Sequence, residues 1–284
     1  MTELELLTKL LPYLATAEGE LLIGAGEDDA AAWREPDGAF TVATCDTSVE
    51  GVHFDLERQQ PEDVGWRALA FALGDLAAKG ATPTYGMVAL SMPRAWGAGT
   101  AEGLYRGLAG LAGEVGLKLV GGDTTASPGQ GVLTLALLGR AAVAPRSRSS
   151  VRAGWQVGVT GPLGATSLSV RRPRPLLARG AELAAAGYSS GDISDGLLRE
   201  MDKYAAAAAV GARLRLPLIP CLEGVDPRQA LVSGEEVELV SCGPPPLPSG
   251  LVLVGELTAA PEVVVLDGAG EVVEMGVRGY DHFA

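Results

Sequence analysis

The sequence has few cysteine, histidine and aromatic residues among its 284 positions. Its three cysteines, Cys45, Cys221 and Cys242, are widely spaced and odd in number, and none belongs to a Cys-x-x-Cys pair. This pattern excludes a disulfide framework and fits a reducing cytoplasm. The N-terminus lacks the basic segment that opens a signal peptide, and no apolar run is long enough to span a membrane. We therefore expect a soluble, cytoplasmic protein with no membrane partner.

Positive charge is also scarce, because 22 lysines and arginines face 35 aspartates and glutamates and leave a net charge of −13. This balance argues against nucleic acid as the main partner. Hydrophobic residues make up 47% of the chain, so a large core is available and disorder is not expected. The abundance of glycine and alanine favours a closely packed α/β (α+β) fold, in which helices pack on mixed sheets.

The length of the chain suits two domains better than one. Residues 144–154, A-P-R-S-R-S-S-V-R-A-G, are polar and basic and contain a proline, which is typical of a domain boundary. We therefore predict two domains, residues 1–143 and residues 144–284, with the boundary in this segment.

The sequence contains neither a P-loop nor a Gly-x-Gly-x-x-Gly fingerprint. Residues 21–30, L-L-I-G-A-G-E-D-D-A, predict a short strand that breaks into a glycine-rich turn carrying Asp28 and Asp29. Such a turn lets backbone amides and short carboxylates approach a ligand closely. Because the two common phosphate-binding motifs are missing, any nucleotide must be held in another way. Arg148 is our candidate for facing phosphates, while Arg146 and Arg152 are equally well explained as solvated linker residues.

Residues 44–54, T-C-D-T-S-V-E-G-V-H-F, follow a β-like run at residues 40–43. The pattern predicts that Asp46 lies where a buried strand emerges into a loop, near Glu50 and His53. Clustered oxygen ligands suit a hard cation such as Mg²⁺, which then holds phosphate oxygens. On this segment alone, an ordinary polar loop explains the pattern equally well.

Two further aspartates lie in apolar or glycine-rich surroundings. Asp75 lies in a predicted helix over residues 61–80, and a carboxylate among so many apolar residues is costly unless it is paired or metal-bound. A place on the wet face of that helix beside Lys79 is the alternative. Asp123 lies in G-G-D-T-T, residues 121–125, directly after a predicted strand, although the same residues also suit an ordinary turn.

Asp192, Ser194 and Asp195 lie in D-I-S-D-G-L, just before a predicted helix that reaches about residue 209. Two acids three residues apart can share one side of a turn at the positive end of a helix. N-capping explains one of them, but not both together with the serine. Short carboxylates without cysteine or histidine partners favour Mg²⁺ over zinc, and Mg²⁺ ions that bridge phosphates favour phosphoryl transfer.

The order of these motifs resembles that of the thiamine-monophosphate kinase family. The motifs are G-A-G-E-D-D-A, T-C-D-T-S-V-E-G-V-H-F, A-L-G-D-L-A-A-K-G-A, G-G-D-T-T, D-I-S-D-G-L and the terminal G-Y-D-H-F. Aminoimidazole ribonucleotide synthetase and selenophosphate synthetase are relatives by fold. The resemblance implies a two-domain protein, usually a homodimer, that transfers the γ-phosphoryl group of ATP directly to thiamine monophosphate and yields thiamine diphosphate. It also implies that the N-terminal domain, residues 1–143, binds ATP and Mg²⁺ and forms the dimer, and that residues 144–284 form a C-terminal α/β domain that completes the active site.

The resemblance also implies roles for residues that match the family motifs, with no protein nucleophile among them. The implied Mg²⁺ ligands are Asp29, Thr44, Asp46, Asp75, Asp123, Asp192, Asp195 and the backbone carbonyl of Cys45. The implied ATP contacts are Tyr105, Gly122, Asp123, Arg148 and Ser194. The implied contacts of thiamine monophosphate are His53 and Glu235, with Tyr280 as an aromatic surface for its rings.

The sequence departs from the family pattern at several places. Cys45 replaces a serine or threonine, and an extra residue in the first turn allows either Asp28 or Asp29 to be the ligand. The motif around Glu235 lacks one glycine and a tyrosine, and the segment between Gly164 and Asp192 is short. Two alternatives therefore stay open: a related ATP-dependent enzyme with another small acceptor, and a non-catalytic nucleotide-binding dimer.

Overall fold

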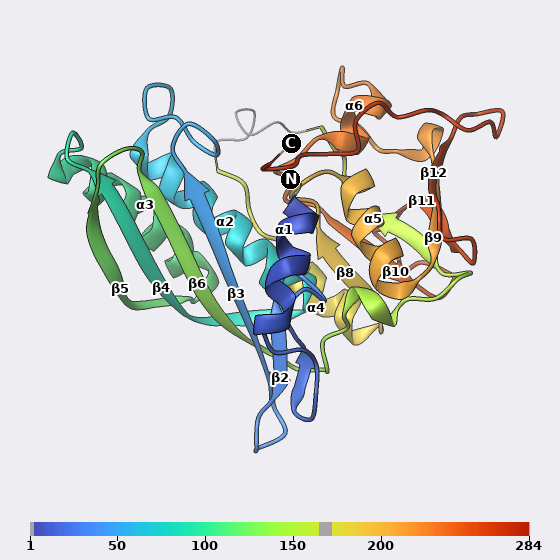
Figure 1. The fold of residues 1–284 in the computed structure, drawn as a ribbon, viewed down its shortest axis with the longest axis horizontal. Helices are drawn as coiled ribbons and strands as arrows, with labels where there is room; N and C mark the ends of the chain where they lie inside the picture. The colour runs from blue at the N-terminus through green and yellow to red at the C-terminus, as the bar shows by residue number, and fades with distance from the viewer. Residues whose placement is uncertain (1–2, 165–171, 284) are drawn as a thin grey trace.

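Two sheets lie side by side in the computed structural model, which describes residues 3–164 and 172–283 (Figure 1). Part of the short segment between Gly164 and Asp192 lies outside the described residues. The first sheet has the strand order β1-β2-β3-β6-β4-β5 and the second has the order β12-β9-β11-β7-β10-β8. The predicted fold class, mixed sheets with packed helices, is confirmed.

The strands of the first sheet are β1 (Leu21–Ile23), β2 (Ala31–Arg34), β3 (Phe40–Val49), β4 (Ala81–Pro93), β5 (Lys118–Ser127) and β6 (Val132–Ala141). The strands of the second sheet are β7 (Gln156–Val159), β8 (Ser189–Asp192), β9 (Gly211–Arg215), β10 (Leu239–Gly243), β11 (Val252–Thr258) and β12 (Val263–Leu266). The helices are α1 (Glu3–Leu10), α2 (Pro61–Ala78), α3 (Ala98–Val115), α4 (Leu177–Ala185), α5 (Leu197–Ala208) and α6 (Pro227–Val232). Among the described residues, no helix has the length and apolar character needed to cross a bilayer.

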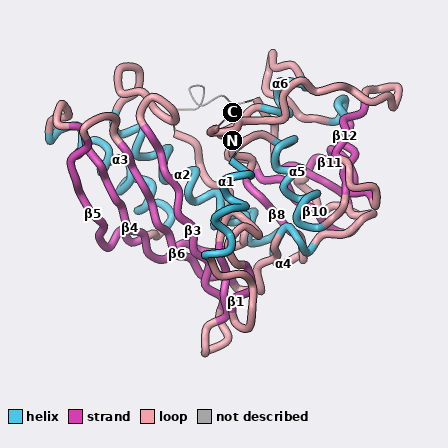
Figure 2. The backbone as a smooth tube through the Cα atoms, viewed as in Figure 1, coloured by secondary structure: helices cyan, strands magenta, loops and turns pink. Residues whose placement is uncertain are grey.

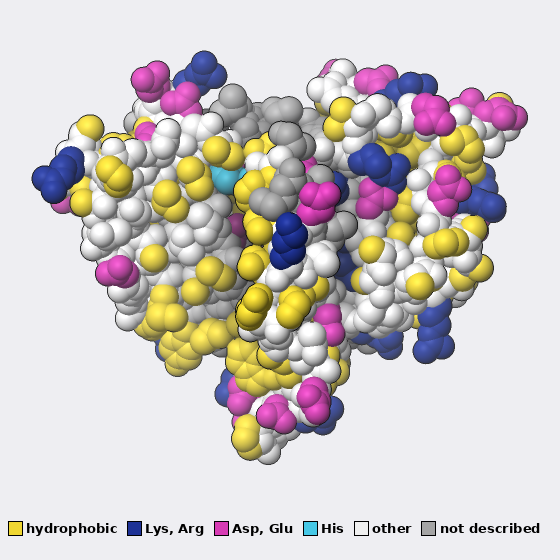
Figure 3. Space-filling view, viewed as in Figure 1, with side chains coloured by type: hydrophobic (Ala, Val, Ile, Leu, Met, Phe, Trp, Pro, Cys, Tyr) yellow, Lys and Arg dark blue, Asp and Glu magenta, His cyan; other side chains and the backbone are white. Residues whose placement is uncertain are grey.

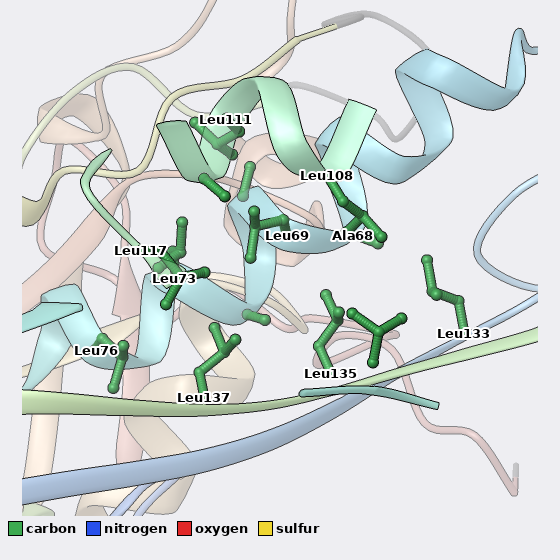
Figure 4. Close-up of a cluster of buried hydrophobic side chains, with 14 of the residues drawn as sticks. Ala68, Leu69, Leu73, Leu76, Leu108, Leu111, Leu117, Leu133, Leu135 and Leu137 are labelled. Carbon is green, nitrogen blue, oxygen red and sulfur yellow. The ribbon is translucent and has the colours of Figure 1, made fainter. Parts of the chain in front are cut away.

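Helices α2 and α3 cover one face of the first sheet with leucine side chains. Alternate residues of β6, among them Leu133, Leu135 and Leu137, point toward α2, because successive side chains of a strand face opposite sides (Figure 4). Leu69 and Leu73 of α2 meet them in the same cluster. Helix α2 also contacts α4 and β8, which belong to the half of the molecule that contains the second sheet. Almost all of its length is therefore buried between this half and the half that contains the first sheet.

Two glycines allow α2 and α3 to approach closely. A Cβ atom at Gly65 would lie 2.0 Å from the carbonyl oxygen of Leu104, and one at Gly107 would lie 1.9 Å from that of Glu62. Any side chain at these positions would therefore force the helices apart. The close crossing fixes the position of α2, which carries Asp75 toward the second half.

The opposite face of the first sheet is open to solvent. Tyr85, Met87 and Val120 are 48%, 50% and 59% exposed on β4 and β5. Hydrophobic side chains are scattered over this face with few charged ones between them (Figure 3). Exposed apolar patches of this kind mark sites of interaction with other proteins.

Two polar motifs that we predicted as loops lie inside strands. Asp46 is in the middle of β3, which pairs with β6 without interruption from Phe40 to Val49, and Asp123 lies within β5. The prediction failed because strand partners distant in the sequence extend the pairing past the apolar run. Residues 271–275 contain no regular strand, and Val272 forms an isolated bridge with Leu266. After β12 the chain returns across the second half without long regular elements (Figure 2).

Candidate functional site

A cavity of about 760 Å³ lies between the two halves. Helix α2 and strand β3 line one side. The segment after β8, Lys203 of α5, residues 232–235 and the C-terminal segment line the other. The sequence-predicted site residues that line it are Asp29, Cys45, Asp46, His53, Asp75, Asp192, Ser194, Asp195, Glu235 and Tyr280. Segments far apart in the chain therefore meet around one volume.

Asp29, Asp75 and Asp192 form an acid cluster at this cavity. Each offers one carboxylate oxygen, and these oxygens all lie within 4.8 Å of one another. Asp75 comes from the last turn of α2, Asp192 ends β8, and Asp29 lies in the turn between β1 and β2. The fold thus brings together acids separated by more than a hundred positions, as the numbering shows.

Burial and mutual repulsion dominate the electrostatics of this acid cluster. Burial and the charge of Asp29 raise the pKa of Asp75 well above its usual value, although the Thr44 hydroxyl donates a hydrogen bond of 2.5 Å to its Oδ2. Burial, then Asp75 and Asp29, raise the pKa of Asp192. Burial also acts to raise the pKa of Asp29, but Arg148 and other nearby cations outweigh it and lower that pKa.

The acid cluster fits a divalent cation. Asp192 Oδ1 is buried and has no hydrogen-bond partner within the described part of the chain. A buried carboxylate oxygen without a donor is costly, and a cation between it and two neighbouring carboxylates would remove that cost. The ligands are all oxygen atoms of short side chains, which suits Mg²⁺.

Arg148 lies behind the acid cluster and does not line the cavity. Its guanidinium donates hydrogen bonds to Glu200 at 2.7 and 3.0 Å and also bonds to Asp29. Its backbone N–H donates to Asp28, whose carboxylate also pairs with Lys79 at 2.6 Å. Asp28 is therefore held in a buried ion network, and Asp29 is the acid of this pair that reaches the cavity.

The sequence reasoning missed Lys203 of α5. Its Nζ lies 3.0 Å from Asp195 Oδ2, 3.5 Å from Glu200 Oε2 and 3.9 Å from Asp29 Oδ1. Burial lowers its pKa, but Glu200, Asp29 and Asp195 outweigh burial and raise the pKa above its ordinary value. No local motif marks this lysine, and only its place eight residues after Asp195 on an amphipathic helix connects it to the site.

The two histidines of the sequence meet at the wall of the cavity. The rings of His53 and His282 lie 5.2 Å apart, and Tyr280 meets His282 edge-on at 4.8 Å. Burial and the neighbouring His282 lower the pKa of His53. Burial raises the pKa of Asp46 nearby. This aromatic cluster, with the C-terminal segment as its outer wall, offers flat surfaces for a heterocycle.

Arg67 and Glu235, which both line the cavity, join the two halves. The Arg67 guanidinium donates to Glu235 Oε2 at 3.0 Å, and the Arg67 side chain is 6% exposed. Glu235 has a φ of 54°, an uncommon left-handed conformation for a residue with a side chain. Sequence reasoning missed Arg67, because it lies within the apolar helix run W-R-A-L-A-F.

Tyr105, Gly122 and Asp123 are absent from the residues that line the cavity. Four paired residues form one row across the sheet. They are Asp123 of β5, Ala89 of β4, Thr134 of β6 and Thr47 of β3. Three strand spacings put Asp123 roughly 14 Å from Thr47. Ala89 and Thr47 are exposed on the open face, so Asp123 shares that face and lies across the sheet from the acid cluster.

Comparison with known proteins gives matches over nearly the whole chain. Residues 27–141 match the family model of AIR synthase related protein, N-terminal domain. Thiamine-monophosphate kinase of Escherichia coli (strain K12) is 30% identical, with 99% of this chain and 98% of that protein covered. Thiamine-monophosphate kinase of Mycobacterium tuberculosis (strain H37Rv) is 33% identical, with 87% and 83% covered.

Solved structures share the fold. A structure described as AaThiL complexed with AMPPCP and TMP superposes with a TM-score of 0.82 at 23% sequence identity, covering 99% of this chain and 97% of that one. At this identity the likeness shows the fold alone. The shared fold includes both halves that border the cavity.

Proposed function

This chain belongs to the thiamine-monophosphate kinase family, as its motifs predict, and we propose that it transfers the γ-phosphoryl group of ATP to the phosphate of thiamine monophosphate. The observation that carries the proposal is the convergence of Asp29, Asp75 and Asp192 within 4.8 Å of one another at a cavity between the two halves. Nothing in this geometry requires a protein nucleophile. An oxygen of the acceptor phosphate attacks the γ-phosphorus in line, and the bond to the leaving ADP breaks.

The acid cluster is the proposed cation site. Asp29, Asp75 and Asp192 would hold Mg²⁺, with Asp46 and Asp195 beside them at the cavity wall. Bound Mg²⁺ would neutralise the charges of the two phosphate groups. The repulsion between these two anions opposes their reaction, and the cation would lower it. Thr44 holds Asp75 in place by its hydrogen bond. The backbone carbonyl of Cys45 remains a proposed ligand, and Ser194 is proposed to contact the nucleotide.

The aromatic cluster is the proposed site of the thiamine rings. His53, Tyr280 and His282 line the cavity, and neighbouring rings among them lie 4.8 to 5.2 Å apart. Glu235 carries a negative charge that suits the cationic thiazolium ring. Arg67 holds that carboxylate at 3.0 Å and fixes the side of the cavity on which it lies.

We further propose a homodimer in which the open face of the first sheet is covered by a second copy. Tyr85, Met87 and Val120 give this face an apolar character, and Asp123 lies on it rather than in the cavity of its own chain. A second copy would bring Asp123, together with its neighbour Gly122 on β5, toward the site of its partner. Tyr105 lies on α3, which packs on the opposite side of the sheet, so this arrangement does not account for its implied contact with ATP. The site would then be composite.

The remaining proposals concern organisation and location. Residues 1–143 and 144–284 are proposed as two domains, because each contributes one complete sheet and the cavity lies between them. The net charge of −13 supports small anionic ligands held through cations rather than nucleic acid as the partner. A cytoplasmic location fits the absence of a disulfide among the described residues.

The direct test is to incubate the purified protein with ATP, Mg²⁺ and thiamine monophosphate and to measure ADP and thiamine diphosphate together. Equal amounts of both products support the proposal. ADP formed only with a different small phosphate or acid as acceptor would replace thiamine monophosphate in it. Nucleotide binding without ADP formation with any acceptor would instead identify a non-catalytic dimer.

A further inference from the structure

Lys203 occupies an unusual position for a lysine. Its ammonium lies among Asp195, Glu200 and Asp29 at 3.0, 3.5 and 3.9 Å, and its side chain is still 31% exposed. It lines the same cavity as the acid cluster. The ammonium is therefore surrounded by carboxylates on the protein side and accessible from the cavity side.

The other cations near the acid cluster are committed elsewhere. Arg148 makes a two-point contact with Glu200, and the buried Lys79 pairs with Asp28. Among the described residues that line the cavity, Arg67 is the other lysine or arginine, and it lies against Glu235. Lys203 is thus the one ammonium placed beside the acid cluster with access to a ligand.

The contacts of Lys203 can be exchanged more readily than those of Arg148. A lysine is a compact charge on a flexible stem with three rotatable donors, whereas arginine holds a carboxylate with a rigid fork. Its distances to Glu200 and Asp29 exceed normal hydrogen-bond lengths. A divalent cation that binds Asp29 and Asp195 would take over the charges that now hold the ammonium.

We propose that Lys203 is a phosphate-binding residue that changes partners when the site is loaded, moving from Asp195 and Asp29 to an oxygen of the nucleotide triphosphate. This inference rests on the proposed nucleotide function and adds to it a residue that the family motifs do not mark. In the unloaded protein the same ammonium screens the repulsion among the carboxylates. On loading, the triphosphate replaces the carboxylates as its counter-charge.

The test compares Lys203→Met with wild type and with Lys9→Met, at an exposed lysine on α1 that is not among the residues lining the cavity. At saturating Mg²⁺, Lys203→Met should weaken ATP binding and raise the KM for ATP by roughly ten- to a hundredfold, because a charge-assisted hydrogen bond is lost. Mg²⁺ binding without nucleotide, measured by calorimetry, should be unchanged or tighter, because a competing cation has been removed. Lys9→Met should match wild type in both measurements.

The same two measurements, ATP binding and Mg²⁺ binding, also define the result that would contradict the proposal. If Lys203 only screens the carboxylates, Lys203→Met will alter Mg²⁺ binding and melting temperature while leaving ATP affinity at saturating Mg²⁺ equal to wild type, and the inference is then wrong. Lys203→Gln is the second variant should the methionine protein fail to fold, since its amide can still donate to Asp195. Adding methylammonium to Lys203→Ala should restore ATP binding in part, and no restoration counts against the proposal.

Failure of the proposed function would be visible separately. If the wild-type protein binds no ATP in the presence of Mg²⁺, the kinase proposal itself fails, and with it the premise of this inference. If wild type is active and Lys203→Met has wild-type ATP affinity, only the role of Lys203 is refuted. The first result is measured on the wild-type protein and the second on Lys203→Met, in the same ATP-binding assay.

Discussion

At the scale of single residues, Asp192 carries the least compensated charge of the acid cluster. Burial and the charges of Asp75 and Asp29 raise its pKa well above the usual value, and its Oδ1 has no donor within the described residues. Asp29, by contrast, is held by Arg148, and Asp75 accepts the hydroxyl of Thr44. A protein that keeps such a carboxylate gives up stability for a function that needs it.

Asp192→Asn should therefore stabilise the protein when no divalent cation is present. Removing a buried, repelled carboxylate at nearly constant volume should raise the free energy of unfolding by roughly 0.5–2 kcal/mol. The same variant should lose the further stabilisation that Mg²⁺ gives to wild type. Thermal unfolding with EDTA and with Mg²⁺ measures both effects. A variant that is less stable than wild type in EDTA would contradict the view that repulsion dominates at Asp192.

Arg67→Met should weaken the acceptor side of the site more than the nucleotide side. Arg67 contacts Glu235 at 3.0 Å, and without it Glu235 is less firmly held. We expect the KM for thiamine monophosphate to rise about tenfold, with the KM for ATP nearly unchanged. Arg58→Met, at an arginine that is 73% exposed, is the matched control and should behave as wild type. A rise confined to the KM for ATP would contradict the assignment of Arg67 to the acceptor side of the site.

The sequence alone marked the aspartates and Arg148, but it did not mark Lys203 or Arg67. Asp75 and Asp192 could be singled out because a carboxylate in an apolar or helix-leading context needs an explanation within its own segment. Lys203 and Arg67 lie in segments whose local patterns are fully explained by an amphipathic helix and a buried helix. His282 lies in the terminal motif G-Y-D-H-F, but the motif gave it no role. The importance of these three residues comes from contacts with residues far away in the chain, which no local pattern encodes.

At the scale of elements, helix α2 determines where the two halves meet. It contacts α3 on one side and α4 and β8 on another, and glycines let the neighbours approach. Gly107 of α3 faces the carbonyl of Glu62, and Gly180 of α4 would place a Cβ only 1.8 Å from the carbonyl of Ala77. Asp75 lies in the last turns of α2, so its distance to Asp192 depends on these crossings.

Gly107→Ala should be strongly destabilising, whereas Gly113→Ala on the same helix should not be. A methyl group at Gly107 cannot fit without moving the backbone of α2, and overpacking of this kind costs about 1–3 kcal/mol or more. At Gly113 a methyl group meets nothing within 4 Å, so the better helix propensity should add about 0.5–1 kcal/mol. Chemical denaturation of both variants checks the contrast. Equal effects would show that the crossing tolerates a wider spacing.

The elements also show why local reading ended β3 and β5 too early. The apolar runs before Asp46 and Asp123 predicted strands, and the polar residues that follow were read as loops. Pairing with β6 and β4 continues through both motifs, because hydrogen bonding in a sheet uses the backbone and tolerates polar side chains. Helix α2 was predicted almost to its ends, since its proline near the start and the apolar run are local signals.

At the scale of the whole molecule, the position of Asp123 separates two possible kinds of site. In its own chain Asp123 lies on the open face of the first sheet, and three strand spacings separate it from Thr47. If the site belongs to one chain, Asp123 has no part in it. If a second copy covers the open face, each site combines Asp192 of one chain with Asp123 of its partner, as a symmetric dimer requires.

Mixing two inactive variants distinguishes these arrangements. Asp192→Asn and Asp123→Asn should each abolish turnover as homodimers. In a mixed dimer both substitutions fall in one composite site and leave the other intact, so an equimolar mixture after subunit exchange should recover about a quarter of wild-type activity. Activity of the mixture and its mass in solution are measured together, with Asp37→Asn, at an exposed acid, as the control partner. No recovery from a mixture that contains mixed dimers would show that one chain supplies both acids, and full activity of Asp123→Asn alone would remove Asp123 from the site.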